Sequence, residues 1–294
     1  MGILEPLLAS GPVLIDGGMS TQLETMGHVV DDPLWTARIL IERPDVVTAA
    51  HRAFRAAGAQ IAITASYQVS REGFRSVGLT AADADAALRA SIAAARAAGC
   101  SLVAASVGPY GAITHDGAEY RGRYDRSIDE LASFHAERIS VLADAAPDLL
   151  AIETIPDADE MTAIAQVLQD HPDIPVWCSF SAADGARLWA GQAVEDAVRI
   201  AERCPDLIAV GVNCTAPEHV PELIVRVAAT TDRPVIAYPN AGGTWDASTG
   251  VWRDPTTEAV AVGAWLDAGA RLVGGCCGTD AGAIAAIAQA LSTR

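Results

Sequence analysis

A recurring junction in the chain limits its fold more than any other feature. At this junction an alanine-rich stretch ends near Gly or Pro and a short apolar run follows at once, as in RAAGAQIAITAS, RAAGCSLVAASVG, DAAPDLLAIET and DAGARLVGGCC. The runs are continuous rather than alternating, which is typical of strands buried on both faces of a parallel sheet. With VLIDGG at 13–18 included, there are eight such runs, centred near residues 14, 62, 104, 151, 178, 210, 237 and 273.

The stretches between the runs have the pattern of connecting helices. They are amphipathic and rich in alanine, as at 83–98, 129–145, 157–169 and 257–268. Eight strands alternating with helices predict an α/β fold, a (β/α)8 or TIM barrel, with residues 1–294 as a single domain. The alternative is an open doubly wound sheet. It is disfavoured because DGGMST follows the first strand in place of the dinucleotide fingerprint G-x-G-x-x-G.

Composition excludes several classes of function. The chain has 37 acidic and 20 basic residues, a formal net charge of −17, so we expect a small-molecule ligand rather than nucleic acid or an anionic membrane. Lysine is absent, which disfavours Schiff-base aldolases, pyridoxal-phosphate enzymes and P-loop NTPases, because each needs a Lys amine.

The N-terminal region and the cysteines indicate a cellular compartment. MGILEPLLAS lacks the basic segment and apolar run of a signal peptide, and no apolar stretch of about 20 residues suggests a membrane span. We therefore expect a cytoplasmic protein whose six cysteines are thiols or metal ligands rather than disulfides. The sequence does not distinguish a monomer from a small homo-oligomer.

Polar and reactive side chains close the apolar runs. In a TIM barrel the C-terminal ends of the strands meet at one open end, the mouth, where barrel enzymes carry out their chemistry. The residues predicted to lie there are Asp16, Thr64, Ser66, Glu153, Asn213, Cys214, Asn240, Cys276 and Cys277.

Three of these residues have the pattern of a metal site. Cys214 ends the sixth run and Cys276 and Cys277 end the eighth, so the two strand ends are on the order of 10 Å apart at the mouth. Adjacent strand residues point to opposite faces, so Cys276 and Cys277 can share an ion only if the chain leaves strand geometry, which flanking glycines allow. Three thiolates leave one tetrahedral position of zinc open, which is typical of a catalytic site. A redox pair is the alternative, and the other three cysteines are interpreted as small core residues.

An open zinc site with three thiolate ligands suits a substrate thiol, which can bind as a nucleophilic thiolate. A sulfonium or quaternary ammonium compound would be the natural methyl donor. Asp16 and Glu153 can bind an α-ammonium group, while the Gly17 and Gly18 N–H groups can bind a carboxylate.

Several other polar residues are candidates for the substrate site. Thr64 and Ser66 can add hydroxyl contacts or only satisfy local backbone groups, and Asp16 can also be a helix cap. Asn213 is included because it closes the sixth run. The aromatic rings of the long segment after the third strand are candidates for contact with a cationic donor, namely Tyr110, Tyr120 and Tyr124.

At this point the sequence resembles the homocysteine S-methyltransferases, most closely the branch that uses S-methylmethionine. The matching segments cover nearly the whole chain: LIDGGMSTQLE, DDPLWTARIL, GAQIAITASYQ, SVGPYGA, EYRGRY, LLAIET, GVNC, YPN and GARLVGGCCGT. The resemblance implies zinc on Cys214, Cys276 and Cys277, the homocysteine amine on Asp16 and Glu153, and its carboxylate on the Gly17–Gly18 backbone and Thr64, with Ser66.

The predicted function is therefore zinc-dependent methyl transfer from a sulfonium donor to L-homocysteine, forming methionine. The donor is S-methylmethionine, with S-adenosylmethionine as the other option. Two alternatives stay open: a methyltransferase for another thiol or selenol, such as selenohomocysteine or selenocysteine, and a non-catalytic zinc- or thiol-binding barrel. The chain shows no cobalamin or folate module, which disfavours the methionine synthase reaction.

Overall fold

The computed structural model describes residues 2–30, 32–114, 116–242, 244–246, 251–253 and 262–293. Eight parallel strands form one sheet in the order β1-β10-β7-β6-β5-β4-β3-β2, and a parallel bridge between Ile15 and Ile61 joins the two outer strands into a ring. The strands are β1 (Val13–Leu14), β2 (Ile61–Ile63), β3 (Leu102–Val107), β4 (Leu149–Ile155), β5 (Val176–Phe180), β6 (Leu207–Asn213), β7 (Val235–Tyr238) and β10 (Ala270–Val273). All eight predicted strands are present, and the TIM barrel is confirmed.

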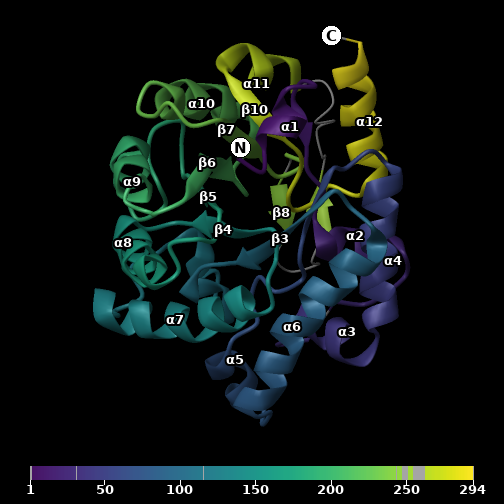
Figure 1. Ribbon diagram of the computed structural model, residues 1–294, viewed down its shortest axis with the longest axis vertical. Coiled ribbons are helices and arrows are strands. Elements are labelled where there is room, and N and C mark those ends of the chain that lie inside the picture. Colours follow the sequence, from purple (N-terminus) through teal and green to yellow (C-terminus); the bar gives the residue numbers. More distant parts are fainter. Residues whose placement is uncertain are drawn as a thin grey trace.

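Helices surround this ring, as Figure 1 shows. They are α1 (Glu5–Leu8), α2 (Met19–Thr25), α3 (Thr36–Glu42), α4 (Pro44–Ala56), α5 (Arg71–Ser76), α6 (Ala81–Ala98), α7 (Ile128–Asp144), α8 (Ala158–Val167), α9 (Val194–Ala201), α10 (Val220–Ala228), α11 (Val262–Ala268) and α12 (Ala281–Ser292). The predicted helices at 83–98, 129–145 and 157–169 correspond to α6, α7 and α8. Of the prediction at 257–268, residues 262–268 form α11 and the rest lie outside the described residues.

Local sequence explains where the longest helices begin and end. Thr80 and Ser127 each form a capping box with the acidic residue three positions later, and these boxes begin α6 and α7. Gly99, with φ of +78°, ends α6 in the left-handed conformation that glycine adopts at no steric cost.

The core has two layers, one on each side of the strands. The larger layer packs the outer faces of the strands against the helices. The smaller one fills the barrel interior with side chains such as Trp177 and Leu272, and Leu7 and Leu8 of α1 add to it together with the preceding Leu4. The Arg271 guanidinium, at the start of β10, donates a hydrogen bond to the Leu8 carbonyl. This contact places α1 at the N-terminal end of the barrel. The opposite end, the mouth, is left for polar side chains.

The loop after β7 contains an element that the sequence did not predict. Here β8 (Thr244–Asp246) and β9 (Val251–Arg253) form a separate antiparallel pair. No helix within the described ranges combines the length and the apolar character that a bilayer span requires.

Candidate active site

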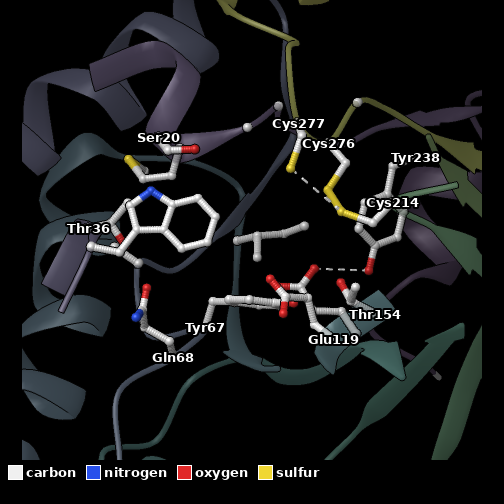
Figure 2. A pocket seen from close by; sticks show the side chains of 18 of the residues that line it. Ser20, Thr36, Tyr67, Gln68, Glu119, Thr154, Cys214, Tyr238, Cys276 and Cys277 are labelled. Carbon is white, nitrogen blue, oxygen red and sulfur yellow. Dashed lines mark hydrogen bonds between the residues drawn. A yellow bond between two sulfur atoms is a disulfide. The ribbon is translucent and has the colours of Figure 1, made fainter. Parts of the chain in front are cut away.

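A pocket opens at the mouth of the barrel, among the ends of β1, β2, β4, β6, β7 and β10. Figure 2 shows Cys214, Cys276, Cys277 and Tyr238 at one side of this pocket and other polar residues, Thr36 and Gln68 among them, at the other. The surface of the lining is mostly apolar, with hydroxyl, amide and carboxylate groups at particular positions, as is usual for a small-molecule site.

The three predicted cysteines converge in this pocket. Their Sγ atoms all lie within 4.8 Å of one another, and those of Cys214 and Cys277 are 3.9 Å apart. Cys214 and Cys276 are joined as a disulfide, which differs from the expectation that all six cysteines are thiols or metal ligands. Cys276 and Cys277 are not bonded to each other. The cluster is oxidised, because the disulfide between Cys214 and Cys276 uses two of the three sulfur atoms that could bind a metal.

The chain leaves strand geometry before the vicinal cysteines, as the sequence predicted. β10 ends at Val273, and the Cys276 N–H then donates to the Pro239 carbonyl at 2.7 Å. The Ala241 N–H donates to the Cys277 carbonyl at 2.8 Å. These bonds fix the cysteine loop to the end of β7, so both thiols are turned towards Cys214.

The flanking glycines act mainly through close packing rather than through unusual dihedral angles. Only Gly278, with φ of +84°, adopts the left-handed conformation; Gly274 and Gly275 do not. A Cβ on Gly274 would lie 2.8 Å from the Asp16 carbonyl oxygen, which is too close for carbon and oxygen. The expectation that Gly274 and Gly275 are needed for backbone freedom is therefore wrong. They are needed because no space is left for a side chain at either position.

Gly18 provides a test of this packing. A Cβ on Gly18 would lie 2.5 Å from the Cys276 carbonyl oxygen. We expect Gly18→Ala to displace the cysteine loop and to weaken metal binding by about 10-fold or more, measured by competition with a chelator. Gly2→Ala is the control, because its Cβ would make only ordinary contacts with Glu5. Unchanged metal affinity in Gly18→Ala would show that the close approach does not position the ligands.

Glu153, at the end of β4, lines the pocket as predicted. Its two carboxylate oxygens accept hydrogen bonds from the Ser106 hydroxyl and from Tyr238, the latter at 3.1 Å. Burial raises the pKa of Glu153 to about 7, although both hydrogen bonds favour the charged form. The carboxylate therefore changes its charge near neutral pH.

Asp16 lies beneath the pocket rather than on its surface. Its Oδ2 accepts a hydrogen bond from the Ile63 N–H at 2.9 Å, while its buried Oδ1 has no partner within the described part of the chain. Burial, with repulsion from Glu153, raises the pKa of Asp16 well above its usual range. His51 Nδ1 is 3.9 Å from Asp16, too far for a hydrogen bond, and burial lowers the pKa of His51 to about 4. A neutral His51 supplies no positive charge that would favour the ionised form of Asp16.

The predicted hydroxyl and amide residues are divided between the pocket and its support. Thr64 lines the pocket, and its Oγ1 accepts from the Ser106 N–H at 3.0 Å. Ser66 is fully buried and donates to the Ser106 carbonyl at 2.7 Å. Asn213 does not line the pocket either, because both ends of its amide bond Thr154, which has φ of +62°. Asn213 thus holds Thr154, a lining residue, in a strained conformation.

The two glycines after β1 both line the pocket, but the N–H of the second is already used inside the protein. The Gly18 N–H donates to the Thr279 carbonyl at 2.9 Å. The prediction of a carboxylate site on both amides therefore needs correction, because one amide already has an internal acceptor.

Of the three tyrosines in the segment after β3, only Tyr120 reaches the pocket. Its hydroxyl is 4.0 Å from the Cys277 Sγ. Tyr110 and Tyr124 pack together beside α7, with ring centroids 5.4 Å apart.

Four further residues line the pocket that the sequence analysis did not single out, namely Trp35, Tyr67, Gln68 and Glu119. All four lie within the segments that carry the resemblance, DDPLWTARIL, GAQIAITASYQ and EYRGRY.

Comparison with known proteins gives this geometry a family. A family model described as homocysteine S-methyltransferase matches residues 13–291. Homocysteine S-methyltransferase YbgG of Bacillus subtilis is 39% identical, with all of both chains covered. Homocysteine S-methyltransferase of Escherichia coli is 39% identical, over 94% of each chain.

Solved structures agree with the sequence comparison. The metallated form of the Escherichia coli homocysteine methyltransferase MmuM superposes with a TM-score of 0.88 at 38% identity, covering 97% of this chain and 99% of that one. Its oxidised form gives 0.89 at 38% identity, covering 98% and 99%. The chain belongs to the homocysteine S-methyltransferase family.

Proposed function

We propose that this protein transfers a methyl group from S-methylmethionine to the thiol of L-homocysteine, with a zinc ion held by Cys214, Cys276 and Cys277. The observation that carries the proposal is the convergence of the three Sγ atoms within 4.8 Å at the side of a pocket that also contains Glu153. Three sulfur donors leave one tetrahedral position for a substrate sulfur.

The spacing of the sulfur atoms supports zinc as the metal. Two thiolates bound to one tetrahedral zinc at about 2.3 Å are about 3.8 Å apart. The separation of Cys214 and Cys277, 3.9 Å, already fits this value, whereas the disulfide between Cys214 and Cys276 must be reduced first. A bound zinc ion would supply a site at which a thiol loses its proton and stays nucleophilic. The metallated relative supports a metal here, and the thiolate donor set favours zinc.

The chain's own residues bind and orient homocysteine in this proposal. Glu153 receives the α-ammonium group, and behind it lies the Oδ1 of Asp16, which has no hydrogen-bond partner in the described part of the chain and offers a further carboxyl oxygen. We assign the carboxylate to the Gly17 N–H beside Thr64, whose hydroxyl already bonds Ser66 and the Ser106 N–H, while Ser66 and Asn213 hold the neighbouring backbone. The amino-acid end is thereby fixed, so that the sulfur points towards the cysteine cluster.

The reaction is a displacement in which atoms and charges balance. The homocysteine sulfur forms a new bond to the methyl carbon, and the bond from that carbon to the sulfonium sulfur breaks with its electron pair staying on the donor. The thiol proton is released, and two methionine molecules result. Residues of the pocket contribute by holding the two sulfur atoms and the methyl carbon in line.

Isotope transfer tests the proposed function. Reduced, zinc-loaded protein is incubated with homocysteine and S-methylmethionine that carries ¹³C in both S-methyl groups. We expect two singly labelled methionines per donor consumed, measured by mass spectrometry, and slower or no transfer from S-adenosylmethionine. Absence of methionine formation from any sulfonium donor, with one zinc bound per chain, would contradict the proposal.

A further inference from the structure

The charged groups that line the pocket all have the same sign among the residues that the structure describes. Among its described residues are two carboxylates, Glu119 and Glu153, and the three cysteines, whereas no Arg or His lines it. A site with this lining attracts cations and repels anions.

The carboxylates of Glu119 and Glu153 differ in the hydrogen bonds that they accept. Glu153 accepts hydrogen bonds on both oxygens. Glu119 is half-buried, and in the described part of the chain its carboxylate forms no hydrogen bond or ion pair with another side chain. Arg121 is paired with Asp116 at 2.8 Å instead. Burial raises the pKa of Glu119, and the positive charge of Arg121, which is itself paired with Asp116, lowers it by less.

The short helix η2 (Ala118–Tyr120) that presents Glu119 is held firmly in place. A Cβ on Gly111 would lie 2.5 Å from the Glu119 nitrogen, so the two backbone segments are in close contact. Downstream, the Tyr124 hydroxyl donates to the buried Glu160 at 2.9 Å, and the Arg123 N–H donates to Asp157 at 2.9 Å. The position of Glu119 is therefore set by packing rather than by a free surface loop.

Glu119 lies close to the place where the methyl group must be transferred. It lines the same pocket as Tyr67, Tyr120 and Cys277, and the hydroxyl of the adjacent Tyr120 is 4.0 Å from the Cys277 Sγ. Figure 2 shows Tyr67 and Glu119 on the wall of the pocket below the cysteine cluster. A cation in front of this wall would have the Glu119 carboxylate and the rings of Tyr67 and Tyr120 as neighbours.

We propose that Glu119 is a specificity-determining residue that recognises the positive sulfonium group of the methyl donor. This inference rests on the proposed function, because it assigns the donor half of the same pocket. It leaves Glu153 to homocysteine and gives each substrate its own carboxylate.

The position of Glu119 has a distinctive kinetic consequence. The sulfonium charge disappears as the methyl group moves, so a carboxylate beside it stabilises the bound donor more than the transition state. Removing the negative charge should therefore weaken donor binding without lowering the rate of the bound complex.

The test compares Glu119→Gln with the wild-type, zinc-loaded enzyme. We expect the KM for S-methylmethionine to rise about 10-fold, the KM for homocysteine to change less than about 2-fold, and kcat to stay level or increase. Glu119→Asp should recover part of the loss. Glu218→Gln is the control for net charge, because Glu218 is exposed and outside the pocket. Zinc content and melting temperature are measured for each variant.

Calorimetric titration without homocysteine separates this inference from the proposed function. S-methylmethionine should bind Glu119→Gln about 10-fold more weakly than wild type, whereas methionine, which lacks the sulfonium charge, should bind both alike. Equal loss for methionine would mean that Glu119 contacts the ammonium group and would overturn the assignment. Unchanged donor binding and KM would also overturn it. If the wild type binds the donor but transfers no methyl group, the proposed function fails and the titration still decides the role of Glu119.

Discussion

Replacement of Cys277 by serine is expected to remove the bound metal and to slow methyl transfer by at least about 1,000-fold, or about 4 kcal/mol of activation free energy. Cys277 is the informative choice because it is the member of the cluster outside the disulfide. Only two of the three thiolates remain in the variant. The proposed site needs three sulfur ligands to hold zinc with its fourth position open. Metal is measured by mass spectrometry of the purified protein and turnover by methionine formation.

Two controls make the Cys277→Ser result specific. Cys100→Ser removes a half-buried thiol away from the mouth, and we expect it to retain metal and activity. Assays are run with and without a reductant, because a disulfide between Cys214 and Cys276 withholds two of the three donors. A Cys277→Ser protein with one zinc per chain and full turnover would contradict the three-thiolate site.

Replacement of Glu153 by glutamine is expected to raise the KM for homocysteine by about 10- to 100-fold, the range for a hydrogen bond to a charged group. The pKa of Glu153 is raised to about 7, so the carboxyl is neutral below that pH and charged above it. Homocysteine binding in the wild type should therefore strengthen as the pH rises through about 7. This dependence should be lost in Glu153→Gln, measured as kcat/KM for homocysteine against pH.

Tyr238→Phe gives the matched variant for the pH profile. The Tyr238 hydroxyl donates to Glu153 and lowers the pKa of that carboxyl. Removal of this hydroxyl should raise the pKa of Glu153 further. The rise of kcat/KM for homocysteine with pH should then occur at a higher pH than in the wild type, although Glu153 is still present. An unchanged homocysteine KM in Glu153→Gln would assign the amine to another group.

The fold and the convergence of the three cysteines could be predicted because their signals are local. Each strand follows closely on a Gly or Pro junction, and a parallel strand buried on both faces is apolar over most of its length, so the eight runs coincide with the eight strands. The cysteines followed from the barrel alone, because Cys214 and Cys276–Cys277 close two strands separated only by β7.

The finer features of the pocket depend on contacts that sequence spacing does not contain. The Gly18 N–H is used by Thr279, a residue from the other end of the chain. Asn213 turns towards Thr154 on β4 instead of the pocket. In the segment after β3 no period of 2 or 3.6 fixes the direction of a side chain, so the sequence does not distinguish Tyr120, which lines the pocket, from the half-buried Tyr124, which does not.

X-ray absorption at the zinc edge tests the central claim of an open three-thiolate site most directly. The reduced, zinc-loaded protein should show three sulfur neighbours at about 2.3 Å and one lighter ligand. Addition of homocysteine should replace that ligand with a fourth sulfur at about the same distance. A zinc ion whose coordination stays unchanged when homocysteine binds, or that already has four sulfur ligands without it, would contradict the account.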